Sequence, residues 1–99
     1  MAWEIPEELK QEFRASAKER VDLALAALMP DGVANEVVVQ MHTLAGEASM
    51  LGMMELGEAA RNAEAAGKAW VAAPSAQTQL TCAKLVRSVG RLLAAESAP

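Results

Sequence analysis

Apolar residues recur every three or four positions through four successive segments, which together fill almost all of the 99-residue chain. This spacing places the apolar side chains on one face of an α-helix. Proline or glycine separates each segment from the next, at Pro30-Asp31-Gly32, at Leu51-Gly52 and at Pro74. The pattern predicts an all-α fold, an antiparallel (up-down-up-down) four-helix bundle with short connections.

Residues that are frequent at the ends of helices mark where the predicted helices begin and end. Pro6 suits a first helical position, and acidic residues directly after it complement the positive end of the helix dipole. Gly52 is placed for the left-handed conformation that ends many helices, and Ser75 is a suitable N-cap. The expected helices run from Pro6 to the turn at Pro30, from about Val33 to Leu51, from about Met53 to Val71, and onward from Ser75.

Composition supports the all-α assignment and narrows the classes of function. Alanine, the strongest helix former, is the commonest residue, whereas aromatic residues make up 3% of the chain. The chain is short enough for one core, so we expect a single domain over residues 1–99. Its net charge of −4, with no run of Lys or Arg, argues against binding to nucleic acid.

The chain holds one cysteine and one histidine, which argues against an internal disulfide and against a metal site. The acidic N-terminus does not resemble a signal peptide, and no stretch is apolar enough to cross a membrane, so we expect a cytoplasmic protein. Cys82 and Trp70 lie on apolar stripes and are expected in the core. Met50, Met53 and Met54 are interpreted either as core residues or as an adaptable docking surface.

The only histidine, His42, is predicted to face solvent. At 100° per residue it lies roughly 140° from the apolar seam of its helix, and Gly46 lies roughly 180° from that seam. A glycine inside a helix costs roughly 0.5–1 kcal/mol relative to alanine. An exposed glycine one turn after the histidine therefore indicates close approach by a partner, over a face that also holds the small Ala45 and Ser49. The alternative is an incidental surface histidine.

The segment from His42 to Gly52, His-Thr-Leu-Ala-Gly-Glu-Ala-Ser-Met-Leu-Gly, with Leu56 beyond it, resembles the signature of the histidine-containing phosphotransfer (HPt) domain. That signature is roughly His-x-Leu-Lys-Gly-x-(Ala/Ser), then Leu-Gly, then Leu. The chain departs from it at Ala45, where the family commonly has a lysine expected to support the phosphoryl group. The resemblance covers the central third of the chain in detail, and its whole length in size and helix number.

The resemblance implies a four-helix phosphocarrier whose exposed histidine, His42, accepts and donates a phosphoryl group in a two-component phosphorelay. The implied partners are a response-regulator receiver domain and a histidine kinase. The chain has no nucleotide-binding loop and is too short for a kinase fold, so it is expected to be a carrier without enzyme activity of its own. It needs no cofactor; Mg²⁺ would come from the partner. We expect a monomer.

Glu64 stands where phosphotransfer domains of chemotaxis kinases often carry a glutamate that bonds the histidine ring. Helix geometry independently agrees. His42 lies ~15 Å before Gly52 and Glu64 lies ~18 Å after it, at 1.5 Å of rise per residue. The two residues are therefore level on adjacent antiparallel helices. A carboxylate on one ring nitrogen would fix the tautomer and leave the other nitrogen free to attack. The alternative is a solvated helix glutamate.

Arg61 and Lys68 lie one turn to either side of Glu64 on the same helix face. Either could support the phosphoryl group in place of the missing lysine, or both could be surface charges that maintain solubility.

Two other functions stay open. A helical adaptor would bind receiver or kinase domains without carrying phosphate, and the alanine at position 45 favours it. A four-helix carrier of a metal or cofactor is a weaker alternative, because the chain lacks ligands.

Overall fold

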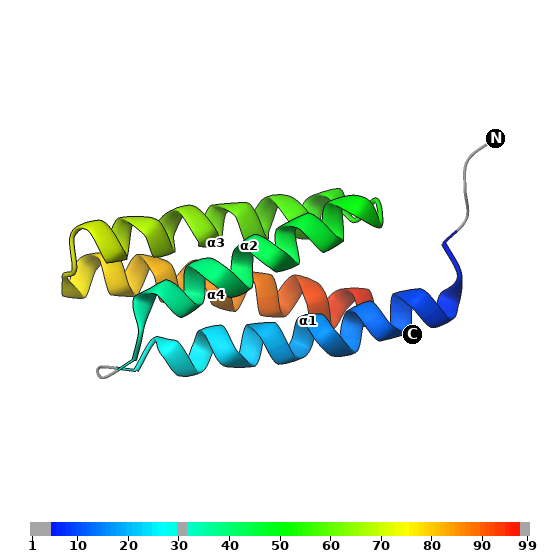
Figure 1. Cartoon of the computed structure of the whole chain (residues 1–99), viewed down its shortest axis with the longest axis horizontal. Helices are drawn as coiled ribbons and strands as arrows, with labels where there is room; N and C mark the ends of the chain where they lie inside the picture. The colour runs from blue at the N-terminus through cyan, green and yellow to red at the C-terminus, as the bar shows by residue number, and fades with distance from the viewer. Residues whose placement is uncertain (1–4, 30–31, 98–99) are drawn as a thin grey trace.

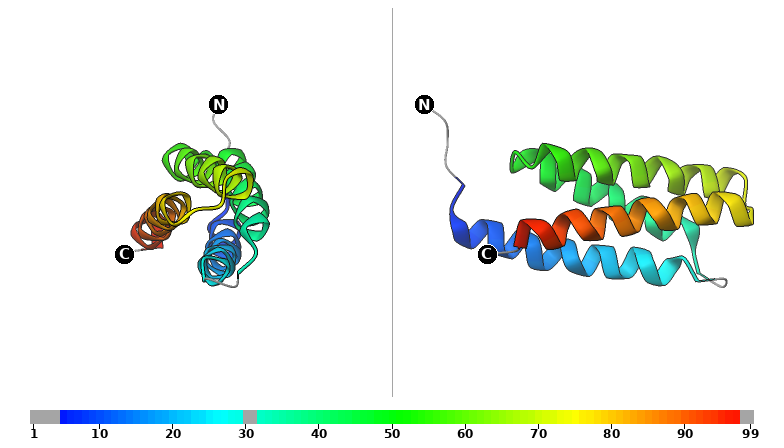
Figure 2. Two further views of the ribbon diagram at one scale, coloured as in Figure 1. Left: turned by 90° about the vertical axis from the view of Figure 1, so that its left-hand side faces the viewer. Right: turned by 180° about the vertical axis from the view of Figure 1, so that it is seen from behind.

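The computed structural model describes residues 5–29 and 32–97, and these form four helices: α1 (Glu7–Ala27), α2 (Ala34–Met50), α3 (Met54–Ala72) and α4 (Ala76–Ser97). In Figure 1 the α2–α3 turn lies at the same end of the molecule as the beginning of α1 and the end of α4. The end-on view in Figure 2 shows the helices around a common axis, and each contacts its two neighbours. The predicted antiparallel four-helix bundle is confirmed.

The helix ends are close to their predicted positions. Pro6 precedes α1 rather than opening it, and its carbonyl accepts the Lys10 N–H at 3.2 Å. The hydroxyl of Ser75 accepts the Thr78 N–H at 3.0 Å, so the predicted N-cap of α4 is confirmed. Gly52 has a φ of 74°, the left-handed conformation expected after α2. In the first turn, Pro30-Asp31 lies outside the described residues.

The core contains the apolar seams predicted for the helices, including Trp70 and the fully buried Cys82. Burial raises the pKa of the Cys82 thiol. The interpretation of the methionines as core residues is wrong at two positions, because Met50 is 82% exposed and Met54 is 63% exposed. Both lie close to the α2–α3 turn, where the bundle ends and no further helix covers them.

The α2 and α3 helices approach each other over small residues. A Cβ atom added to Gly67 would lie 3.1 Å from a methyl carbon of Val38 and 3.3 Å from one of Val37. A Cβ added to Gly57 would lie 3.0 Å from the hydroxyl oxygen of Ser49. These distances are shorter than ordinary van der Waals contact. The two glycines therefore permit a helix separation that any larger residue would increase.

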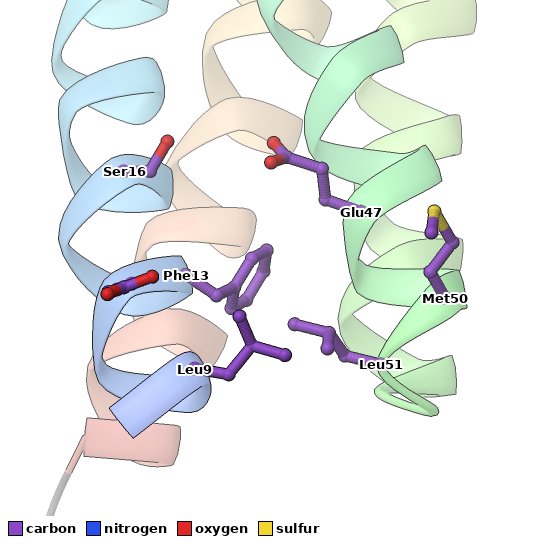
Figure 3. A pocket seen from close by; sticks show the side chains of 7 residues that line it. Leu9, Phe13, Ser16, Glu47, Met50 and Leu51 are labelled. Atoms are coloured by element: carbon purple, nitrogen blue, oxygen red, sulfur yellow. The ribbon is translucent and has the colours of Figure 1, made fainter. Parts of the chain in front are cut away.

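The α1 and α2 helices meet through longer side chains. Arg20 of α1 donates to Glu47 at 3.0 Å and to the amide oxygen of the buried Gln40 at 3.2 Å, which links α1 to two points of α2. Towards the α2–α3 turn a shallow apolar groove separates these helices, and Figure 3 shows Leu9, Phe13 and Leu51 pointing toward one another across it. Leu9 lies at the rim of this groove and is 40% exposed.

Candidate functional site

His42 projects from the middle of α2 into solvent. Its side chain is 75% exposed, as its angular distance from the apolar seam predicts. The α2 seam on the opposite side of the helix is buried, with Val37, Met41 and Leu44 wholly inaccessible. The core thus fixes the rotation of α2, and that rotation carries the imidazole outward.

The imidazole is held from one side by α3. Its Nδ1 lies 3.0 Å from Oε2 of Glu64, whose side chain is only 13% exposed. An ionised carboxylate only accepts hydrogen bonds, so this contact places the ring proton on Nδ1. The lone pair then resides on Nε2, the ring nitrogen that does not face Glu64. The two residues, predicted to be level from their similar distances to Gly52, are in contact.

Lys68 reaches the same carboxylate atom. Its Nζ lies 3.3 Å from Oε2 of Glu64, one helical turn further along α3. Because both distances end on one oxygen, the ammonium lies within two hydrogen-bond lengths of the His42 ring. Glu64 is thereby held by a cation on one side while it accepts from the imidazole on the other.

Arg61, one turn before Glu64, has a different partner. Its Nη2 donates to the hydroxyl of Ser49 on α2. Ser49 is partly buried, and its hydroxyl occupies the space left by the absent side chain of Gly57. Sequence reasoning did not predict this pairing. The available signal was Gly57 itself, a second helical glycine that faces the core in an alanine-rich helix.

Of the three small residues predicted to form the face around His42, two are accessible. Gly46 is exposed, and a Cβ atom added there would have nothing within 4 Å. Ser49 is partly exposed. The prediction is wrong for Ala45, which is 4% exposed. Ala45 lies on the side of α2 that faces α3, and its carbonyl oxygen would be 3.5 Å from a Cβ at Gly57, so the close helix contact covers it.

Two other kinds of functional feature to consider in the described residues are a metal site and a membrane-spanning helix. In residues 5–29 and 32–97, no group of three or more His, Cys, Asp or Glu side chains is arranged to hold a metal ion. None of the helices, so far as the structure describes them, is long and apolar enough to cross a membrane.

The described residues thus form a four-helix bundle that exposes a histidine, with a carboxylate beside its Nδ1 and a glycine one turn away, as the resemblance to the HPt domain implies. The family model described as Hpt domain matches residues 8–95, so the chain belongs to the Hpt domain family. Members of this family act in histidine phosphotransfer in two-component systems. No curated protein and no solved structure gave a significant match.

Proposed function

We propose that this chain is a phosphocarrier that moves a phosphoryl group on Nε2 of His42 between a kinase or receiver-domain aspartate and another receiver domain. One observation carries the proposal: the exposed imidazole has its Nδ1 occupied by Glu64, which leaves Nε2 as the free nucleophile. An incidental surface histidine has no need of a shielded carboxylate from a neighbouring helix.

In the forward step, the Nε2 lone pair attacks the phosphorus of an aspartyl phosphate on the partner. A nitrogen–phosphorus bond forms, and the phosphorus–oxygen bond to the aspartate breaks, with its electron pair leaving on the carboxylate oxygen. The Nδ1 proton stays in place, so the ring gains positive charge as the new bond forms. Glu64 stabilises that charge, because it lies 3.0 Å from Nδ1 and only 13% of its side chain is exposed. The return step reverses each change.

The partner supplies the remaining electrostatic groups. In-line phosphoryl transfer depends on positioning and on neutralising the equatorial oxygens. The proposed Mg²⁺ and acidic pocket therefore belong to the receiver domain, and this chain contributes the nucleophile and its orientation. The open position at Gly46 supports close approach by that domain, since nothing in the chain itself fills it. We propose that the carrier acts as a monomer, with one His42 per docking event.

The test is to incubate the chain with a receiver domain that carries radiolabelled aspartyl phosphate. We expect transfer of label to the chain as a phosphate that is labile in acid and stable in base. His42→Gln should take up no label, and Thr43→Ala, a matched change at the next position of α2, should take up as much as the unmodified chain. A chain that binds the receiver without gaining label would instead be the adaptor, the candidate that the alanine at position 45 favours.

A further inference from the structure

Two cations flank Glu64 on α3, and the structure gives them different partners. Lys68 pairs with the carboxylate of Glu64 itself, 3.3 Å away. Arg61 donates to the uncharged hydroxyl of Ser49, and within the described part of the chain no ion pair involves its guanidinium. The charge of Lys68 is therefore matched by an acid, whereas the charge of Arg61 is not.

Residues of both α2 and α3 fix the position of the Arg61 guanidinium. Gly57 leaves room for the Ser49 hydroxyl between α2 and α3, and that hydroxyl accepts from the guanidinium at the edge of the interface. On α2, Ser49 and His42 lie two helical turns apart on one face, and Gly46 lies between them. Because Gly46 has no side chain, the surface between the guanidinium and the imidazole is open.

We propose that Arg61 binds the phosphoryl group carried by His42, and so provides the positive charge that a lysine at position 45 would provide in other members of the family. This inference rests on the proposed function. In the unphosphorylated chain Arg61 is held by Ser49. A guanidinium binds the charged oxygen of a phosphoryl group more strongly than a neutral hydroxyl, because only the phosphoryl group carries the opposite charge. Once His42 carries phosphate, the guanidinium turns from Ser49, across Gly46, to the new anion.

Ala45 itself supports this assignment. It is 4% exposed and lies under α3, so a long cationic side chain at that position would have to leave between the packed helices. Arg61 approaches from the opposite helix and extends over the same interface without disturbing it. The guanidinium also presents several donors in one plane, which suits the oxygens of a phosphoryl group.

The experiment uses the full chain, phosphorylated with phosphoramidate so that no partner protein is present. Phosphorus NMR then follows the second ionisation of the phosphoryl group on His42. A neighbouring cation favours the dianion, so it lowers the pKa of that group. We expect Arg61→Gln to move the titration several tenths of a pH unit upward at low ionic strength, and high salt to diminish the difference.

Two further variants control for charge and for position. Arg61→Lys keeps the positive charge and should retain most of the effect. Arg87→Gln removes an exposed cation from the groove between α1 and α4, and should leave the titration unchanged. Circular dichroism of each variant, before phosphorylation, establishes that the bundle is folded.

The outcomes separate this inference from the proposed function. If His42 is phosphorylated and Arg61→Gln titrates like the unmodified chain, Arg61 does not bind the phosphoryl group and the inference is wrong, while the carrier function stands. The inference is also wrong if Arg61→Gln alters only transfer from a receiver, because the guanidinium then binds the partner. Failure of every variant to accept phosphate at His42, in both this reaction and the receiver assay, would overturn the proposed function.

Discussion

The two helix interfaces of α2 differ in how closely they bring the backbones together, and the candidate site residues His42 and Glu64 lie at only one of them. Toward α3, small residues such as Gly57 and Gly67 leave no space for added side-chain atoms. Toward α1, contact depends on Phe13, on the long side chain of Arg20 and on an apolar groove (Figure 3). At the close interface hydrogen bonds link His42 to Glu64 and Arg61 to Ser49. At the other interface the hydrogen bonds of Arg20 accompany the apolar contacts.

The largest difference in phosphate uptake and in stability is expected between a change at the proposed site and a change at the α1–α2 interface. His42→Gln should remove all phosphate uptake and change the free energy of unfolding by no more than about 0.5 kcal/mol, because the side chain is 75% exposed. The measurements are label transfer from a phosphorylated receiver and urea unfolding followed by circular dichroism.

Phe13→Ala is the matched variant on the other interface. Phe13 is 5% exposed, and its truncation should lower the free energy of unfolding by about 3 kcal/mol. Uptake of label per folded molecule should be unchanged. Retention of label by His42→Gln, or its loss from folded Phe13→Ala, would show that the two interfaces do not divide function and stability in this way.

A second prediction concerns the separation of α2 and α3. Gly67→Leu inserts a side chain where even a Cβ would lie 3.1 Å from Val38, and we expect it to lower the free energy of unfolding by about 1–3 kcal/mol. It should also shift the nitrogen NMR signals of His42 toward a mixture of tautomers, because the helices that carry His42 and Glu64 are forced apart.

Gly90→Ala adds a single methyl group at a helical glycine between α1 and α4. A Cβ at Gly90 meets only a methyl carbon of Val21, at the ordinary contact distance of 3.5 Å. Alanine should therefore stabilise the chain by about 0.5–1 kcal/mol through helix propensity. Destabilisation by Gly90→Ala would instead show that α1 and α4 are packed too closely at this point to admit a methyl group.

A third, smaller effect is expected at the carboxylate. Glu64→Gln keeps an oxygen that can accept from Nδ1 of His42 but removes the negative charge, so the charge-assisted bond becomes a neutral one. We expect initial transfer from a receiver to slow several-fold, in line with a loss of about 1 kcal/mol. Glu58→Gln, an exposed acid on the same helix, serves as the control and should transfer at the unmodified rate. Equal rates in both variants would mean that Glu64 does not act on the ring.

The smallest expected effect on the free energy of unfolding concerns the buried thiol of Cys82. Its pKa is raised by burial, so the folded chain should react with iodoacetamide far more slowly than a chain unfolded in urea at mildly alkaline pH. Below the ordinary pKa of a thiol both states are protonated. Above it the unfolded state ionises first, so stability should fall as pH rises through that range. Rapid alkylation of the native chain would show that the core opens at α4.

Helix periodicity predicted the bundle, and counting placed His42 level with Glu64, whereas a bond between the two side chains was implied by the resemblance to the HPt domain. The distance of each residue from Gly52 along its helix axis follows from the number of residues between them, because the rise of an α-helix is constant. These distances are therefore known before any packing is known. The burial of Ala45 was not predictable in this way. Its angle from the seam is known from the sequence, but the side on which α3 packs depends on how the chain turns around the bundle.

The contact of Arg61 with Ser49 was beyond sequence analysis for a further reason. It depends on side-chain rotamers and on the space left by Gly57, a residue whose neighbours belong to another helix. Local patterns describe which face a residue occupies. They do not describe which of several donors on that face reaches a given hydroxyl.

The turn at Gly52 also determines which insertions and deletions the site can tolerate. His42 and Glu64 lie 22 positions apart along the chain, on the two arms of the hairpin formed by α2 and α3. They meet because the rotation of each helix turns its side chain toward the other. One residue added within either arm would rotate everything beyond it by about 100° and advance it by about 1.5 Å. Length changes between His42 and Glu64 would thus separate the pair even if every side chain were kept. Changes between α1 and α2, or between α3 and α4, leave the hairpin in phase, so variation in chain length should accumulate there.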